Sequence, residues 1–288
     1  MKIDTSTTKF GAVVTEFDMH NATRNETDDL YDAFLKHGLI IFKGMDIDEA
    51  EHLKLSAIFG EPDIHPIEAI RHSEEPHLIV IAANGGRTVS PDDPDADTII
   101  GRITWHVDLI YTAAPNRGGM LRAITVPQGS GQTGWIDSVA LYKALPTEVK
   151  ARIQGLHVIH SYSHGQRGQT LFAGRGDQFP DVIHPLVYVH PESDLPVLNI
   201  GPSTARKIVG LPEAEADELL AYLLAFAADE ERAYIHSWEP GDVIIWDNWR
   251  TMHRTYGHAK KHRRVMHRTT LKARLKLGEL LDASAQAA

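Results

Sequence analysis

The chain has 288 residues, of which 42% are hydrophobic and 24% charged, which is enough for one domain with a well-buried core. Because it contains no cysteine, disulfides, thiolate metal sites and thiol nucleophiles are excluded, and the composition suits a reducing cytoplasm. A net charge of −10 argues against a nucleic-acid partner, and no apolar stretch approaches the roughly 18 residues that a membrane span needs.

The first part of the chain predicts two helices with clear ends. One helix should run over residues 28–37 and end at Gly38, because glycine readily adopts the left-handed conformation that follows many helices. Asp48 should cap the second helix, which should end at Gly60. The predicted buried positions of the second helix are Leu53, Leu55 and Ile58.

Apolar runs predict strands in both halves of the chain. They lie at residues 10–14, 39–42, 77–83, a segment ending at 105, and 119–126, 156–162, 234–238, 243–246 and 264–271. Later helices should begin at Ser138, Pro146 and Pro212, and the last has a stripe of Leu219, Leu220, Leu223, Leu224 and Phe226. Many strands with helices near the N-terminus and one late insertion predict an α+β fold in a single domain, residues 1–288.

Two long segments are rich in glycine and polar residues. Residues 84–101 and 163–181 contain little apolar sequence, so we expect loops there. Loops of this length beside a site often act as lids.

The sequence His106-Val107-Asp108 is the first candidate for metal binding. Residues two apart on a strand share a face, so His106 and Asp108 could bind one ion. With a second histidine they would form the two-histidine, one-carboxylate site that binds iron(II) and leaves positions open. Since about one His-x-Asp arises by chance in such a chain, the motif alone is weak. His72-Ser73-Glu74 and His190-Pro191-Glu192 have the same spacing and are interpreted as chance matches.

The C-terminal part supplies the other candidates. His253 follows a buried strand, and Arg264 and Arg268 lie on the last predicted strand, on one face and about 13 Å apart along it. Two arginines facing a core are costly unless each meets an anion, and the planar guanidinium suits a carboxylate. The alternative is a surface strand with both arginines in water.

Several ordered motifs together suggest a family. They are Phe59-Gly60-Glu61-Pro62-Asp63-Ile64-His65-Pro66, Trp105-His106-Val107-Asp108, Gly131-Gln132-Thr133, Trp246-Asp247-Asn248 with His253, and Arg264-Val265-Met266-His267-Arg268. In these motifs, over most of its length, the chain resembles the taurine dioxygenase / 2,4-dichlorophenoxyacetate dioxygenase (TauD/TfdA) family. The resemblance implies a double-stranded β-helix (a jelly-roll, cupin-like core) flanked by helices, and a dependence on iron(II), 2-oxoglutarate and O2.

The resemblance also implies a role for each matching residue. The metal ligands and catalytic residues would be His106, Asp108 and His253. The residues that bind 2-oxoglutarate would be Thr133 and Arg264. The substrate residues would be Arg268, His65 and Tyr111, with Arg102 at a position where some relatives have asparagine.

The chain departs from the family pattern near three of these motifs. Trp249 stands where arginine usually follows Asp-Asn, and Ser130-Gly131-Gln132-Thr133 replaces the more usual Gly-Gly-Asp-Thr. Arg102 would add a positive charge near the pocket. None of these changes affects a predicted metal ligand, but Arg102 leaves the substrate open.

The predicted activity is therefore hydroxylation, with or without later cleavage, of a small carboxylate or sulfonate, with release of succinate and CO2. Asp108 favours hydroxylation over halogenation, because a halide would need the place of that carboxylate. A non-catalytic metal-binding sensor and a zinc hydrolase with two histidines and one aspartate remain as alternatives. The resemblance also implies a homo-oligomer, a dimer or tetramer.

Overall fold

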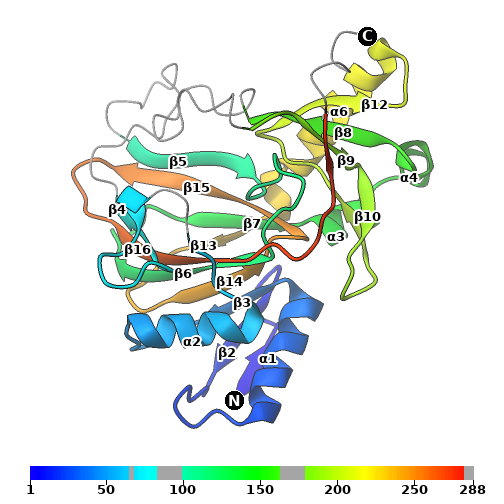
Figure 1. Ribbon diagram of the computed structural model, residues 1–288. Coiled ribbons are helices and arrows are strands. Elements are labelled where there is room, and N and C mark those ends of the chain that lie inside the picture. Colours follow the sequence, from blue (N-terminus) through cyan, green and yellow to red (C-terminus); the bar gives the residue numbers. More distant parts are fainter. Residues whose placement is uncertain (65–67, 83–98, 163–178, 282–288) are drawn as a thin grey trace.

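The computed structural model describes residues 1–64, 68–82, 99–162 and 179–281 (Figure 1). Two β-sheets form its centre. The larger has seven strands, in the order β1 (Lys2–Asp4), β2 (Ala12–Thr15), β3 (Leu39–Phe42), β14 (Val243–Asp247), β6 (Gly118–Thr125), β16 (Val265–Leu271) and β4 (Ile79–Ala82). The smaller has the order β13 (Tyr234–His236), β7 (Thr133–Asp137), β15 (Thr251–Ala259) and β5 (Ile99–His106).

The two sheets pack face to face around one aromatic and aliphatic cluster. Trp135 of β7 lies 6.2 Å, between ring centroids, from Trp246 of β14, and both are fully buried. Met266 of β16 packs in the same cluster. Two antiparallel sheets closed over a shared core form the predicted jelly-roll.

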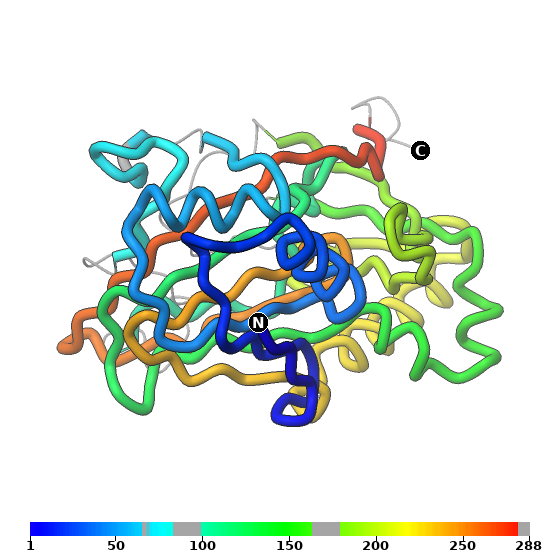
Figure 2. The backbone as a smooth tube through the Cα atoms, turned by 90° about the horizontal axis from the view of Figure 1, so that it is seen from below, coloured from blue at the N-terminus to red at the C-terminus, as the bar shows by residue number. Residues whose placement is uncertain are grey.

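Two capped helices cover the outer face of the larger sheet. α1 (Arg24–His37) begins at Thr23, whose hydroxyl accepts from the Glu26 amide, and α2 (Glu49–Phe59) begins in the same way at Asp48. In the view from below (Figure 2) this blue N-terminal segment lies across the strands. The predicted ends at Gly38 and Gly60 are confirmed.

Most of the remaining elements form a second layer beyond the smaller sheet. They are α3 (Ser138–Ala144), α4 (Thr147–Ile153), α6 (Glu213–Ala227), the 3-10 turn η3 (Glu230–Arg232), the hairpin β10 (Val187–Val189) and β11 (Pro196–Leu198), and a sheet of β12 (Ala205–Val209), β8 (His157–His160), β9 (Val182–Pro185) and β17 (Glu279–Leu280). The other 3-10 turn, η1 (Glu68–Ile70), lies beside β4 at the edge of the larger sheet. α6 packs with Trp105, Ile136 and Met252 on the outer side of the smaller sheet.

Some predicted details were wrong. In α2 the buried residues are His52, Leu55, Ser56 and Phe59, whereas Leu53 and Ile58 are half-buried. The predicted loop 84–101 ends earlier, because residues 99–101 belong to β5, and the rest of it, like 163–178, lies outside the described residues. Strand β15 was not predicted. Among the described helices, none is long and apolar enough to span a membrane.

Candidate active site

The pairing of β5 with β15 brings the predicted metal ligands together. His106 lies opposite His253 in the register of these two strands, with ring centroids 4.1 Å apart. Asp108 follows β5, and its carboxylate lies 3.7 Å from His106 Nε2 and 3.8 Å from His253 Nε2. Residues 106, 108 and 253 thus offer one ligand atom each within 4.8 Å of one another.

The donor chemistry of these three side chains fits a divalent metal. His106 Nδ1 is 2.8 Å from the carbonyl oxygen of Thr104, so this nitrogen donates and Nε2 is free to bind an ion. Burial, helped by the charge of His106, lowers the pKa of His253 well below its usual value, so its ring is neutral, as metal binding requires.

Asp108 is held in its charged form. Burial alone would raise its pKa, but Arg268, His253 and His106 outweigh that effect and lower the pKa to about 2. The Arg268 guanidinium forms an ion pair with Asp108 Oδ2. The site therefore supplies two neutral imidazoles and one carboxylate, the donor set typical of a non-haem iron(II) site.

Asn248 fixes the backbone of Asp108, a role that the sequence analysis did not identify. Its side-chain oxygen accepts from the Asp108 amide at 3.0 Å, and its Nδ2 donates to the Asp108 carbonyl at 2.9 Å. Nδ2 also donates to the carbonyl of Asn116, which lies just before β6. The amide of Asn248 thus holds the turn that bears Asp108 against the larger sheet.

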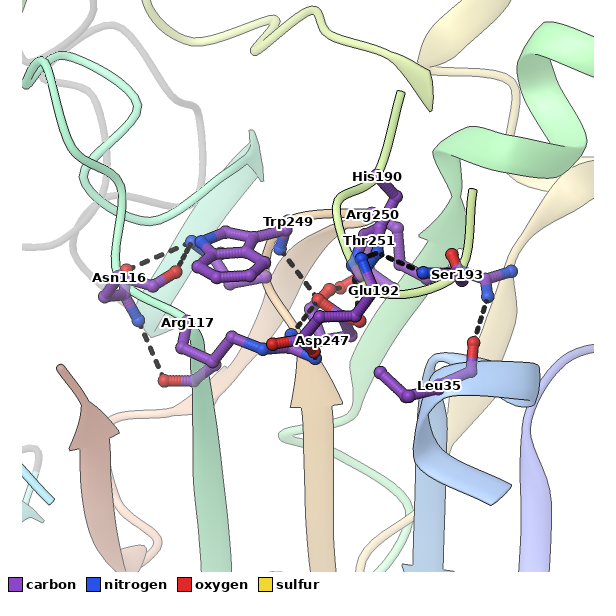
Figure 3. Close-up of polar contacts among 12 residues, drawn as sticks. Leu35, Asn116, Arg117, His190, Glu192, Ser193, Asp247, Trp249, Arg250 and Thr251 are labelled. Atoms are coloured by element: carbon purple, nitrogen blue, oxygen red, sulfur yellow. Dashed lines mark hydrogen bonds and ion pairs between the residues drawn. The ribbon is translucent and has the colours of Figure 1, made fainter. Parts of the chain in front are cut away.

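A buried ionic network anchors the chain from Asp247 to Arg250, just before β15. The carboxylate of Asp247 is fully buried, pairs with Arg117, and lies 3.1 Å from His190 Nε2 (Figure 3). Arg250 pairs with Asp137 and donates to the Leu35 carbonyl at the end of α1. The segment that leads into β15 is therefore fixed from several sides before it reaches His253.

Arg264 lies just before β16 in a position that suits an anion. Its Nε is buried, and neither a hydrogen-bond partner nor a paired acidic group is found for it among the described residues. Burial lowers its pKa to about 10. Gly131, with φ +76°, lies against it, and a Cβ atom there would come within 3.1 Å of Arg264 Cδ and Nε.

Thr133 lies two residues beyond Gly131 and is fully buried at the start of β7. Its hydroxyl oxygen accepts a 2.9 Å hydrogen bond from Trp238 Nε1. Because that bond occupies a lone pair, the hydroxyl proton is free to donate to another group. Trp238 is a second residue whose part the sequence analysis missed, since it is contributed by a segment 105 residues away.

Arg268 faces the inner side of the larger sheet, beside the three predicted metal ligands. Its guanidinium carbon lies 5.3 Å from the Trp246 ring centroid, in addition to its pairing with Asp108. The predicted unbroken strand containing Arg264 and Arg268 is wrong in one respect. β16 begins at Val265, and a β-bulge separates Val265 from Met266.

Tyr111 contributes to an aromatic cluster close to these charges. Its ring centroid is 4.8 Å from that of Tyr162 and 5.2 Å from that of Phe179. Burial, together with Tyr162 and Asp108, raises the pKa of Tyr111, so its hydroxyl stays protonated. An apolar ring could pack against these three aromatic side chains.

The described contacts do not decide the role of two further predicted substrate residues. Arg102 Nε donates to the backbone oxygen of Tyr256 on the neighbouring strand, at 3.5 Å. His65 lies outside the described residues. The apparent chance match His190-Pro191-Glu192 contributes to the Asp247 network instead, through His190.

Comparison with known proteins gives consistent matches. Residues 2–270 match the model of the family described as Taurine catabolism dioxygenase TauD, TfdA family. The chain is 32% identical over 267 residues to the (S)-phenoxypropionate/alpha-ketoglutarate-dioxygenase of Sphingobium herbicidovorans, covering 89% of this chain and 90% of the relative.

Two solved structures have the same fold. A taurine dioxygenase from Burkholderia xenovorans matches with a TM-score of 0.75 and 26% identity, over 96% of this chain and 93% of that one. AAD-2 in complex with Mn(II) and N-oxalylglycine also matches with a TM-score of 0.75, at 25% identity, over 96% and 98% of the two chains.

Proposed function

Because this chain belongs to the TauD/TfdA family and is an iron(II)- and 2-oxoglutarate-dependent dioxygenase, we propose that it hydroxylates a small organic anion and releases succinate and CO2. The observation that carries the proposal is the Arg268 guanidinium. It pairs with Asp108 beside the other predicted metal ligands, and its buried Nε has no hydrogen-bond partner among the described residues, which leaves a donor for an anion. The family membership favours this activity over the metal-binding sensor and the zinc hydrolase.

We propose His106, Asp108 and His253 as the residues that hold iron(II). When bound there, the metal leaves positions open for 2-oxoglutarate and O2 and activates oxygen as 2-oxoglutarate is oxidatively decarboxylated. The chain's own residues orient the proposed ligands. The Thr104 carbonyl accepts a hydrogen bond from His106 Nδ1, which leaves Nε2 for the metal. Asn248 holds the backbone of Asp108, and the Asp247 network holds the segment that leads into β15 and His253.

Arg264 and Thr133 are proposed to bind 2-oxoglutarate. Arg264 would pair with the distal carboxylate, and Thr133 would donate its free hydroxyl proton to a carboxylate oxygen. The observation that supports this is the buried Nε of Arg264, for which neither a hydrogen-bond partner nor a paired acid is found among the described residues, since such a charge is costly unless an anion meets it.

We expect Arg264→Gln to raise the KM for 2-oxoglutarate by on the order of 100-fold, since a charge-assisted pair contributes about 2–3 kcal/mol. The KM for the primary substrate should change far less. Arg263→Gln is the matched control, because Arg263 is the exposed neighbour. Steady-state kinetics with 2-oxoglutarate as the varied substrate checks this, and an unchanged KM would remove Arg264 from the co-substrate site.

The substrate is proposed to be a carboxylate or sulfonate that carries an apolar, preferably aromatic, body. Arg268 would bind the anionic group, with Tyr111, Tyr162 and Phe179 packed against the body. The similarity to a phenoxypropionate dioxygenase supports the aromatic class. Arg102 and His65 stay as further candidates for contacts with the substrate. Hydroxylation of a carbon next to an ether oxygen would also lead to cleavage, because the resulting hemiacetal breaks down.

The test is a panel of aryloxycarboxylates, arylcarboxylates, aliphatic carboxylates and alkylsulfonates, each scored by substrate-dependent release of succinate. We expect the largest response from an aromatic carboxylate. Arg268→Gln should raise the KM for that substrate by about 100-fold and leave the KM for 2-oxoglutarate nearly unchanged. Arg274→Gln, at an exposed arginine, is the control. A flat response to every anion, from an enzyme that still decarboxylates 2-oxoglutarate slowly, would refute the substrate class.

The proposal extends to the oligomeric state and the cellular location of the enzyme. A single dioxygenase domain would act in the cytoplasm as a dimer or tetramer. The cysteine-free sequence is suited to that compartment.

A further inference from the structure

A second group of potential metal ligands lies on the outer face of the larger sheet, away from the predicted iron site. Glu49 is the first residue of α2, His72 follows η1, and His267 lies on β16 next to Arg268. Each offers one ligand atom, and these atoms lie within 4.8 Å of one another. In the part of the chain that the structure describes, this group and the predicted iron site are the two that meet this condition.

The burial of His267 and its missing hydrogen bond point to a ligand independently of this spacing. The residue is 7% exposed, and its Nδ1 is buried with no hydrogen-bond partner among the described residues. That nitrogen lies 3.4 Å from Glu49 Oε1. The His72 ring meets the His267 ring edge-on, with centroids 5.4 Å apart. The contact with Glu49 does not count as a hydrogen bond, so it compensates only in part for the hydration that the buried nitrogen has lost, unless a bound group satisfies that nitrogen.

We propose that Glu49, His72 and His267 form a zinc-binding site distinct from the iron site. Ligand atoms about 2.0–2.2 Å from a tetrahedral zinc ion lie roughly 3.3–3.6 Å apart, which the Glu49–His267 separation already matches. Two imidazoles and one carboxylate are a common zinc donor set, and water would take the fourth position. The ligand atom of His72 must still move closer to the other two, and His72 can do so because it lies in an irregular segment after η1.

Two features oppose zinc binding, and both are small enough to be overcome. Arg122 Nη1 lies 4.0 Å from Glu49 Oε1, and its charge repels a cation. The carboxylates of Asp46, Asp48, Glu49 and Glu51 all act on Arg122 and offset that charge. His72 Nδ1 accepts a 3.3 Å hydrogen bond from the Glu74 amide, and this long bond would be lost if a zinc ion bound Nε2 and the ring proton moved to Nδ1.

A zinc ion there would join three separate parts of the fold. α2, the segment after η1 and β16 would be cross-linked, and β16 carries Arg268 on its opposite face. The site would thus stabilise the strand that supplies an active-site arginine without contacting substrate. Its role would be structural, because its ligands lie on the face covered by α2.

The stoichiometry of zinc binding tests this proposal. Protein stripped of metal is dialysed against Zn²⁺, and the bound zinc is measured. Wild type should bind two ions per chain, because zinc also occupies the iron ligands. His72→Ala and Glu49→Gln should each bind one, and so should His253→Ala. The double variant His72→Ala/His253→Ala should bind none.

A control separates the site from general histidine binding. His77→Ala, which removes a half-exposed histidine from the same segment, should still bind two ions. In His253→Ala, zinc at a hundredfold excess over its Kd should raise Tm by about 5 °C, and this rise should disappear in the double variant. One zinc per wild-type chain, or two in His72→Ala, would overturn the proposal. Iron-dependent decarboxylation of 2-oxoglutarate by His72→Ala should persist, so this result is separable from a failure of the dioxygenase assignment.

Discussion

His253→Ala should lower substrate-dependent succinate release by on the order of 10³-fold or more, equivalent to about 4 kcal/mol of transition-state stabilisation. His253 Nε2 converges with His106 and Asp108, and the remaining pair would hold iron(II) weakly. The loss should appear in kcat and in metal binding together. In anaerobic samples containing iron(II) and 2-oxoglutarate, the weak visible charge-transfer band of wild type should be absent from the variant.

The control for this experiment is His157→Ala. His157 is an exposed histidine on β8, and its replacement should leave both the band and the turnover within about twofold of wild type. Circular dichroism confirms that each variant is folded. If His253→Ala kept a tenth of the wild-type rate with its full complement of iron, the assignment of His253 as a ligand would be wrong.

Arg117→Met should reduce the free energy of unfolding by about 3–5 kcal/mol, the largest stability effect that we expect of a single substitution in this chain. Arg117 is 2% exposed, pairs with Asp247 and Glu192, and stacks on the rings of Trp249 and Phe34. Methionine fills much of the space but leaves the buried Asp247 carboxylate without its main positive partner. Urea denaturation measures the difference.

The pKa of Asp247 determines how the stability loss in Arg117→Met depends on pH. Burial tends to raise the pKa of Asp247, but Arg117, His190 and Arg250 outweigh burial and hold the pKa below its usual range. Such a group stabilises the fold above its unfolded pKa of about 3.9, and the contribution is lost as pH falls through the lower folded value. The difference in the free energy of unfolding between wild type and Arg117→Met should therefore be largest near pH 7 and become smaller in strong acid.

A surface pair provides the comparison. Arg152 and Glu215 form an ion pair whose side chains are 39% and 56% exposed, so Arg152→Met should cost less than about 1 kcal/mol. Asp247→Asn combined with Arg117→Met should cost less than the sum of the two single changes, because the double variant leaves no buried charge unpaired between these two positions. Additive losses would show that the two side chains act independently.

Helix ends could be predicted where single residues in the local sequence determine them. Gly38, through its left-handed backbone, and Asp48, through its capping side chain, each determine a helix end locally. The strand β15 could not be predicted in this way. Its sequence, Thr251 to Ala259, is largely polar, and its strand conformation comes from pairing with β5 on one side and β7 on the other.

The same distinction applies to the site. The spacing of His106 and Asp108, together with the family resemblance, singled out three side chains that the structure brings together, His106, Asp108 and His253. The partners of those ligands were not predicted, because they depend on distant contacts. Asn248 meets Asp108 across 140 residues, and Arg268 pairs with Asp108 across 160. Sequence reasoning assigned Arg268 to substrate alone, whereas the structure also places it against the predicted metal ligand.

The alternation of side chains along β16 limits how this enzyme can change its specificity. Successive residues of the strand point to opposite sides, so Arg268 faces the predicted metal ligands and His267 faces α2. Inserting or deleting one residue between the bulge and Arg268 would exchange them, placing an imidazole in the pocket and a guanidinium beneath a helix. Changes of chain length are therefore tolerable in the turn at 260–263, while new substrate preferences must arise by replacing side chains at fixed positions.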